Sequence, residues 1–141
     1  MSKSLPETIT VDGARLELVL ERVLERAEQV RDRRHARAAV LEGYLDAMLR
    51  YRKSLLLLVR DVSAGPQEFY DRTIRLTARA IGLVAGPGAD LDERVRATQA
   101  LSALGDPLIM FPETPDGELR GRMLDGAWRL LEGPTERRPE P

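Results

Sequence analysis

The 141-residue sequence contains no cysteine, few aromatic residues and no long apolar run. Without cysteine the chain can form no disulfide, thiolate nucleophile or cysteine-ligated zinc site, which fits a reducing cytosol. The longest uninterrupted apolar run, Leu55 to Val59, is far too short to cross a bilayer, and the N-terminus lacks the apolar core of a signal peptide. We therefore expect a soluble, cytoplasmic protein that has no contact with a membrane.

An excess of charge of one sign is also absent. The chain has 22 Lys and Arg residues against 23 Asp and Glu residues, so it has no overall positive field with which to hold a nucleic acid. Only 4% of the residues are aromatic, so Leu, Val, Ile and Ala must fill the core, as they do in many helical proteins. At this length we expect a single domain that removes roughly two thirds of the unfolded chain's surface from water.

Residues 11–30, VDGARLELVLERVLERAEQV, have the spacing of an amphipathic helix. Asp12 is a candidate N-cap, and we expect residues 1–10 before the helix to be flexible. Charged residues occupy one face of this helix. The apolar positions of the other face recur at steps of three, four and one, and they are Leu16, Leu20, Val23, Leu24, Ala27 and Val30.

The segment RDRRHAR, residues 31–37, interrupts the apolar pattern with four arginines. It is either a solvated turn between two helices or a phosphate-binding patch, and the absence of neighbouring aromatic or glycine residues favours the turn. From Ala36 onward apolar residues return at helical spacing, up to a bend predicted near Arg50 to Lys53. The next residues, Leu55 to Leu58, are apolar on all sides, so we expect the centre of the core there.

Two glycine- and proline-rich breaks divide the second half of the chain. SAGPQ precedes a helix that should run to about Ala85, and AGPGAD follows it, with Asp90 as the N-cap of the next helix. In that helix the helical spacing continues at Val95, Thr98, Leu101, Ser102 and Gly105. LGDPLIMFPETP, residues 104–115, is either a kinked extension of this helix or a buried turn.

The last helix has clear signals at both ends. Thr114 is the predicted N-cap and Pro115 the first helical residue, while Gly133 followed by Pro134 ends the helix. Residues 134–141 are charged and rich in proline, and we expect them to be disordered. Together these patterns predict an all-α fold, an antiparallel bundle of about five to six helices over residues 11–133.

Catalytic and metal-binding motifs are scarce. His35 is the single histidine, which excludes paired-histidine sites, and neither a phosphate loop nor a nucleophile elbow is present. Glu42 and Asp46 lie one helical turn apart and would suit acid–base work, but they lie opposite the apolar face, where charges are normally solvated. We expect no enzyme, no metal and no cofactor.

Apolar positions with a few polar groups among them are the remaining candidates for function, because ligand pockets are largely apolar with a few hydrogen-bonding groups. These residues either surround a small-molecule cavity or form ordinary core, and spacing alone favours ordinary core. They are Tyr44, Met48, Phe69, Tyr70, Thr73, Thr77 and Met110.

The order of the helical segments resembles the C-terminal effector-binding domain of the tetracycline-repressor (TetR) family of bacterial transcription regulators. The resemblance covers about residues 13–133 and depends on ARAAVLEGYLDAMLRYRKSLLLLVRD before a Gly-Pro break, then RATQALSALGDPL, then RMLDGAWRLLEG. It implies a helical pocket for a small hydrophobic effector, and a homodimer in which the last two helices of each subunit form a four-helix interface. The implied interface residues are Leu119, Met123, Leu124, Ala127, Trp128 and Leu131.

Regulators of this family begin with a helix-turn-helix domain, whereas MSKSLPETIT, which precedes Val11, contains none. We therefore expect a ligand-binding and dimerisation domain with no DNA-binding module in this chain. Residues 11–30 would be the helix that connects the two domains in the family. The alternative is a protein-interaction module that heterodimerises with an intact repressor. Gly117, Gly121 and Gly126 in the last helix either allow close helix approach or mark a frayed first turn.

Overall fold

The computed structural model describes residues 7–60 and 67–133, and these residues form helices and turns with no strand. The predicted all-α class is confirmed. In the described ranges there are seven helices rather than five or six, because residues 106–110 form a short helix of their own. They are α1 (Glu7–Glu28), α2 (Arg33–Arg50), α3 (Arg52–Arg60), α4 (Gln67–Ala85), α5 (Leu91–Ser102), α6 (Asp106–Met110) and α7 (Asp116–Glu132).

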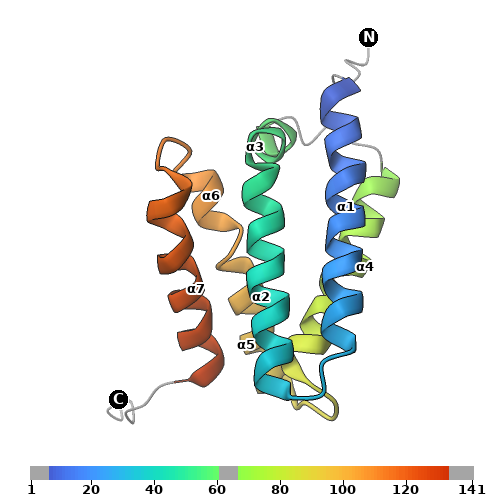
Figure 1. The fold of residues 1–141 in the computed structure, drawn as a ribbon, viewed down its shortest axis with the longest axis vertical. Helices are drawn as coiled ribbons and strands as arrows, with labels where there is room; N and C mark the ends of the chain where they lie inside the picture. Colours follow the sequence, from blue (N-terminus) through green and yellow to red (C-terminus); the bar gives the residue numbers. More distant parts are fainter. Residues whose placement is uncertain (1–6, 61–66, 134–141) are drawn as a thin grey trace.

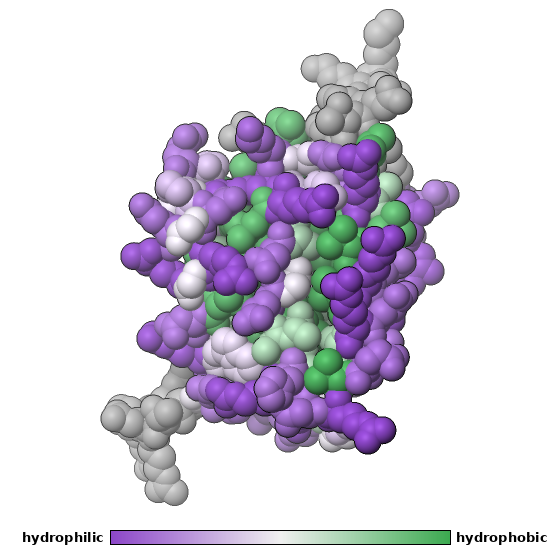
Figure 2. Space-filling view, viewed as in Figure 1, coloured by the Kyte–Doolittle hydropathy of each residue, from purple (hydrophilic) through white to green (hydrophobic). Residues whose placement is uncertain are grey.

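The helices form two layers (Figure 1). α7, α2 and α1 lie side by side in one layer, and α6, α5 and α4 lie behind them, while α3 crosses the upper end. On the face of the first layer, apolar surface is visible between charged side chains, along the gaps on both sides of α2 (Figure 2). Among the described residues no helix is long and apolar enough to span a membrane.

Aspartate side chains begin two of the helices. The Asp90 carboxylate accepts a hydrogen bond from Glu93 N at 2.8 Å, which confirms the predicted N-cap of α5. The Asp32 carboxylate caps α2 in the same way, by accepting a hydrogen bond from His35 N at 3.0 Å. Because α2 begins at Arg33, the turn after α1 is shorter than the turn predicted over residues 31–37. The prediction for Asp12 was wrong: α1 begins at Glu7, and the Asp12 carboxylate instead accepts a hydrogen bond from Ser54 Oγ at 2.6 Å.

Leucines and alanines from both layers fill the core. Leu24 of α1, Leu41 and Leu45 of α2 and Leu104 before α6 are completely buried. We expected the four consecutive leucines of α3 at the centre of the core, but they do not lie there. α3 lies across the end of the bundle, so only part of its circumference faces other helices. Leu57 is 48% exposed. The helix α3 does begin at the predicted bend, after a turn at Tyr51.

The arginines after α1 bind backbone oxygens of another helix. Arg33 donates to Ala85 O, and Arg37 Nε donates to Val84 O at 2.7 Å, so both satisfy carbonyls that the end of α4 leaves without helical partners. Gly86 follows with a φ of +91°, and a Cβ atom there would lie 2.8 Å from Arg33 Nε. Two of the four arginines of the segment RDRRHAR therefore cap α4.

The segment from Leu104 to Pro115 is neither a kinked extension of α5 nor a buried turn, because it forms a separate short helix, α6, whose apolar residues Ile109 and Met110 are exposed. Pro107 lies in the first turn of α6, where a backbone N–H would have no acceptor within the helix, so proline costs no hydrogen bond there. Leu108 is buried. Pro115 rather than Thr114 is the N-cap of α7, one residue later than predicted, and Gly133 ends α7 with a φ of +73°. Of the α5 positions that recur at helical spacing, Leu101 is buried, whereas Val95, Thr98 and Ser102 are exposed. Ala97 and Ala100 are the other buried residues of α5.

Candidate ligand pocket

The predicted ligand-binding residues do not gather in one place. Tyr44 is buried, and its hydroxyl lies 3.4 Å from Thr77 Oγ1, between α2 and α4. Burial raises the pKa of Tyr44, and the hydrogen bond with Thr77 partly offsets this. Thr73 lies one turn before Thr77 on α4 and is half-buried. The Met110 side chain is 71% exposed, so it does not line an enclosed cavity. The side chains of Phe69 and Tyr70 lie outside the described residues.

An apolar pocket of about 90 Å³ lies between α2, α3 and α6. Of the predicted ligand residues whose side chains the structure describes, Met48 alone is among those that line it. Val59 and Ile109 are each about two fifths exposed, so they lie at its rim. The lining residues are Met48, Arg52, Leu55, Leu56, Val59, Gly105, Leu108 and Ile109.

Two further hollows adjoin α3. An open groove of about 500 Å³ has both polar and apolar walls, and a space of about 10 Å³ between α1 and α3 has room for at most one water molecule. Arg52 and Leu56 line the groove as well as the apolar pocket. The groove is lined by Asp12, Leu49, Arg50, Tyr51, Arg52, Lys53, Ser54, Leu56, Pro112 and Asp116.

Arg52 ties α3 to the loop that precedes α7. Its Nη1 donates to Thr114 O and to Asp116 Oδ1, both at 2.7 Å, and its Nη2 donates to Phe111 O at 2.6 Å. The side chain is only 11% exposed. Its Nε is buried and has no hydrogen-bond partner in the part of the chain that the structure describes. Sequence reasoning missed Arg52, because the local pattern does not distinguish it from Arg50 and Lys53.

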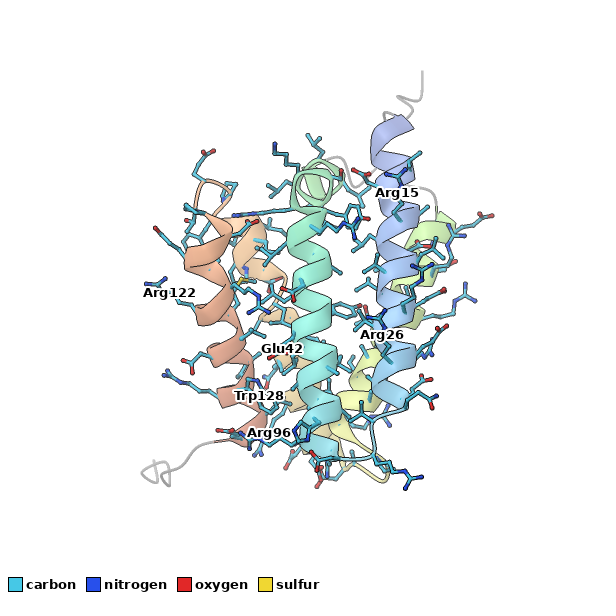
Figure 3. All side chains as sticks on the ribbon, in the orientation of Figure 1. Arg15, Arg26, Glu42, Arg96, Arg122 and Trp128 are labelled. Atoms are coloured by element: carbon cyan, nitrogen blue, oxygen red, sulfur yellow. The ribbon has the colours of Figure 1, made fainter. Side chains whose placement is uncertain are left out.

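The carboxylate pair considered for acid–base work lies on the surface. Asp46 accepts two hydrogen bonds from Arg120, at 2.8 and 3.1 Å, and this pairing raises the pKa of Arg120. Glu42 is exposed on the side of α2 toward α7 (Figure 3). These two carboxylates therefore have no enclosed site around them. The described residues also contain no group of three or more His, Cys, Asp or Glu residues that could hold a metal ion.

The residues expected at a dimer interface divide into two sets. Leu119, Met123 and Ala127 are buried within the chain itself, in its own hydrophobic core. They hold α7 in place and cannot contribute much direct contact with a second subunit. Leu124, Trp128 and Leu131 are only partly buried. Trp128 lies near the lower end of α7 (Figure 3), where the Arg34 guanidinium is 5.4 Å from its ring.

Known proteins offer no template for this site. Comparison with protein-family models, curated proteins and solved structures finds no match to the chain. The resemblance to the TetR family therefore depends on the three segments quoted above and on their order.

Proposed function

We propose that the chain is the effector-binding and dimerisation domain of a cytoplasmic TetR-type transcription regulator, and that a small hydrophobic effector binds between α2, α3 and α6. The apolar pocket of about 90 Å³ is the observation that carries this proposal. Aliphatic cavities stay dry and accept apolar guests; one engineered cavity of about 150 Å³ binds benzene. At about 90 Å³ this pocket is smaller than that cavity, so we expect it to hold a short aliphatic group, such as the apolar end of a longer molecule.

The pocket is connected to the helix that would transmit the signal. α3 forms one wall, and Ser54 of α3 donates a hydrogen bond to Asp12 of α1 at 2.6 Å. In the TetR family the helix in the position of α1 leads to the DNA-reading domain. An effector that displaces α3 would therefore act on α1 through this contact. Direct nucleic-acid binding is not proposed for this chain, because its charges are nearly balanced.

Binding can be tested with small neutral aliphatic probes such as 1-butanol and 1-hexanol. We expect the melting temperature to rise with probe concentration and to saturate, because a ligand that binds only the folded state stabilises it by mass action. Ile109→Trp should fill the rim of the pocket and abolish this rise. Ile74→Trp, at an exposed position on α4, is the matched control and should retain it. Absence of a saturable rise with every probe would contradict the proposal.

The second part of the proposal, dimerisation, concerns a row of residues along α7. Gly117, Gly121, Leu124, Trp128 and Leu131 recur at alternating steps of four and three, which is the spacing of a helix–helix seam. A Cβ atom at Gly117 or Gly121 would meet no atom within 4 Å, so a second helix could approach closely there. We propose that this seam forms the two-fold contact between subunits. The buried residues Leu119, Met123 and Ala127 are not part of it, because they already pack in the chain's own core.

Light scattering during size exclusion can test the dimer. We expect the mass of a dimer, and a monomer for Gly121→Arg, because a large charged side chain would project into the seam. Gly82→Arg on α4 is the control, since that glycine is equally open, and it should stay dimeric. A monomer at high concentration for the unmodified chain would instead favour the protein-interaction module that heterodimerises with an intact repressor.

A further inference from the structure

The outer part of α7 carries two rows of residues side by side, one apolar and one charged. The apolar row is the seam described above, with glycine at positions 117 and 121 and large apolar residues at positions 124, 128 and 131. Each seam residue is followed in the sequence by a charged residue, and these charges alternate in sign. The charged row is Glu118, Arg122, Asp125, Arg129 and Glu132, all of which are exposed.

The position of α7 in the fold leaves both rows accessible to a second subunit. α7 lies at the edge of its layer (Figure 1), and Arg120, which binds Asp46 of α2 at 2.8 Å, lies on the α2 side of the seam. Arg122 of the charged row points away from α2 (Figure 3). Successive residues of a helix are turned by about 100°, so the charged row flanks the seam on the side away from α2.

The sizes of the seam residues favour two antiparallel copies of α7. With a two-fold axis at Leu124, Gly117 comes opposite the second copy's Leu131, because both are equally far from Leu124. Gly121 comes opposite the second copy's Trp128 to within one residue. Each large side chain therefore fills space that a glycine leaves open, as close packing requires. Parallel copies would place glycine against glycine and tryptophan against tryptophan, which leaves gaps at one end and crowding at the other.

The charged row is complementary to itself in the same arrangement. The two-fold axis brings the same flank of both helices together, so Glu118 comes opposite the second copy's Arg129, and Arg122 opposite the second copy's Asp125. Two arginines and two aspartates then alternate around the axis. Within one chain Arg129 binds Asp125 at 3.0 Å, and both side chains are mostly exposed. Exposed ion pairs contribute little energy, so we expect these charges to fix the direction and register of packing more than its affinity.

We propose that the partner of α7 is a second copy of this chain, packed antiparallel with Leu124 at the two-fold axis. The pattern of sizes and charges names that partner because it is complementary to itself, as an isologous contact requires. A different repressor subunit would have to carry both rows in the same register. This inference rests on the proposed dimerisation through α7.

Engineered cysteines test the direction of packing, because the chain has no cysteine of its own. Positions 117 and 131 lie roughly 20 Å apart along one helix, too far for a disulfide within the chain. On oxidation we expect the double variant Gly117→Cys/Leu131→Cys to form disulfide-linked dimers, and Gly117→Cys alone to form none. Leu124→Cys should cross-link at the axis, whereas Gly82→Cys, an equally open glycine on α4, should not.

Light scattering under reducing conditions separates the dimer from its register. If the unmodified chain is a monomer, both the proposed dimer and the antiparallel register fail. If the chain and its variants are dimers but Gly117→Cys cross-links by itself, the copies are parallel and the register is overturned while the dimer stands. A dimeric double variant that does not cross-link overturns the register in the same way.

Charge reversal tests the register without altering the seam. Glu118→Arg should raise the dimer dissociation constant severalfold in sedimentation equilibrium, because it would place arginine opposite the second copy's Arg129. Adding Arg129→Glu should restore the original value. Glu21→Arg, a matched change on the exposed surface of α1, should leave it unchanged. A double variant that dimerises no better than Glu118→Arg alone would overturn the pairing.

Discussion

Gly43 of α2 lies so close to Val23 of α1 that a Cβ atom on Gly43 would be 2.6 Å from Val23 Cγ1. Only glycine fits at this point, which allows the two helices to approach closely. We expect Gly43→Ala to lower the free energy of unfolding by about 1–3 kcal/mol, because an added methyl group in a packed interface forces side chains or backbone to shift. Urea denaturation followed by circular dichroism measures this.

Gly82→Ala is the matched control for that substitution. A Cβ atom at Gly82 would meet no atom within 4 Å, and the residue lies inside α4. Alanine has the higher helix propensity, so this change should raise the free energy of unfolding by roughly 0.5–1 kcal/mol. The same sign of effect in both variants would show that α1 and α2 do not pack as described.

The leucines of α1 and α3 should differ in their contribution to stability. Leu24 is 0% exposed, while Leu57 is 48% exposed. We expect Leu24→Ala to lower the free energy of unfolding by about 2–5 kcal/mol, through lost burial and the cavity left behind. Leu57→Ala should change it by about 0.5 kcal/mol, as surface substitutions usually do. A larger loss for Leu57→Ala than for Leu24→Ala would contradict the placement of α3 at the end of the bundle.

The bond from Arg37 to the end of α4 gives a third prediction. Arg37→Met keeps most of the apolar stem but leaves Val84 O without its donor. We expect a loss of about 1.5 kcal/mol or more in the free energy of unfolding, the usual contribution of a hydrogen bond from a charged group. Arg31→Met removes the same charge at an exposed position and should change stability little. Equal losses in the two variants would mean that capping of α4 is not the cause.

Tyr44 should make stability depend on alkaline pH. Burial raises its pKa above the ordinary value of about 10, so the folded state holds the proton more tightly than the unfolded state does. This stabilisation is fully present below pH 10 and is lost as the pH rises through the folded-state pKa. Relative to the unmodified chain, Tyr44→Phe should therefore gain stability above about pH 10. Urea midpoints of the two proteins at pH 8 and pH 11 provide the comparison, and parallel behaviour would refute it.

Features that depend on near neighbours along the chain could be predicted from the sequence. The N-cap at Asp90, the break near Arg50 and the end of α7 at Gly133 all involve residues within one helical turn. The candidate site was predicted less well. Met48 was expected beside a ligand and does line the pocket. The sequence did not indicate that α3 and α6 form the other walls of this pocket.

What the sequence by itself determined is the helical class and the positions where most helices end, because these follow from propensities and from bonds within a turn. Only the tertiary structure determined which partners the polar side chains bind. Arg37 caps a carbonyl 47 residues away, Arg52 binds one 62 residues away, and Ser54 binds Asp12 across 42 residues. No local pattern encodes such partners, since they become neighbours only when the helices pack. The same packing placed Leu55 and Leu56 in one wall of a pocket, and none of the four consecutive leucines at the centre of the core.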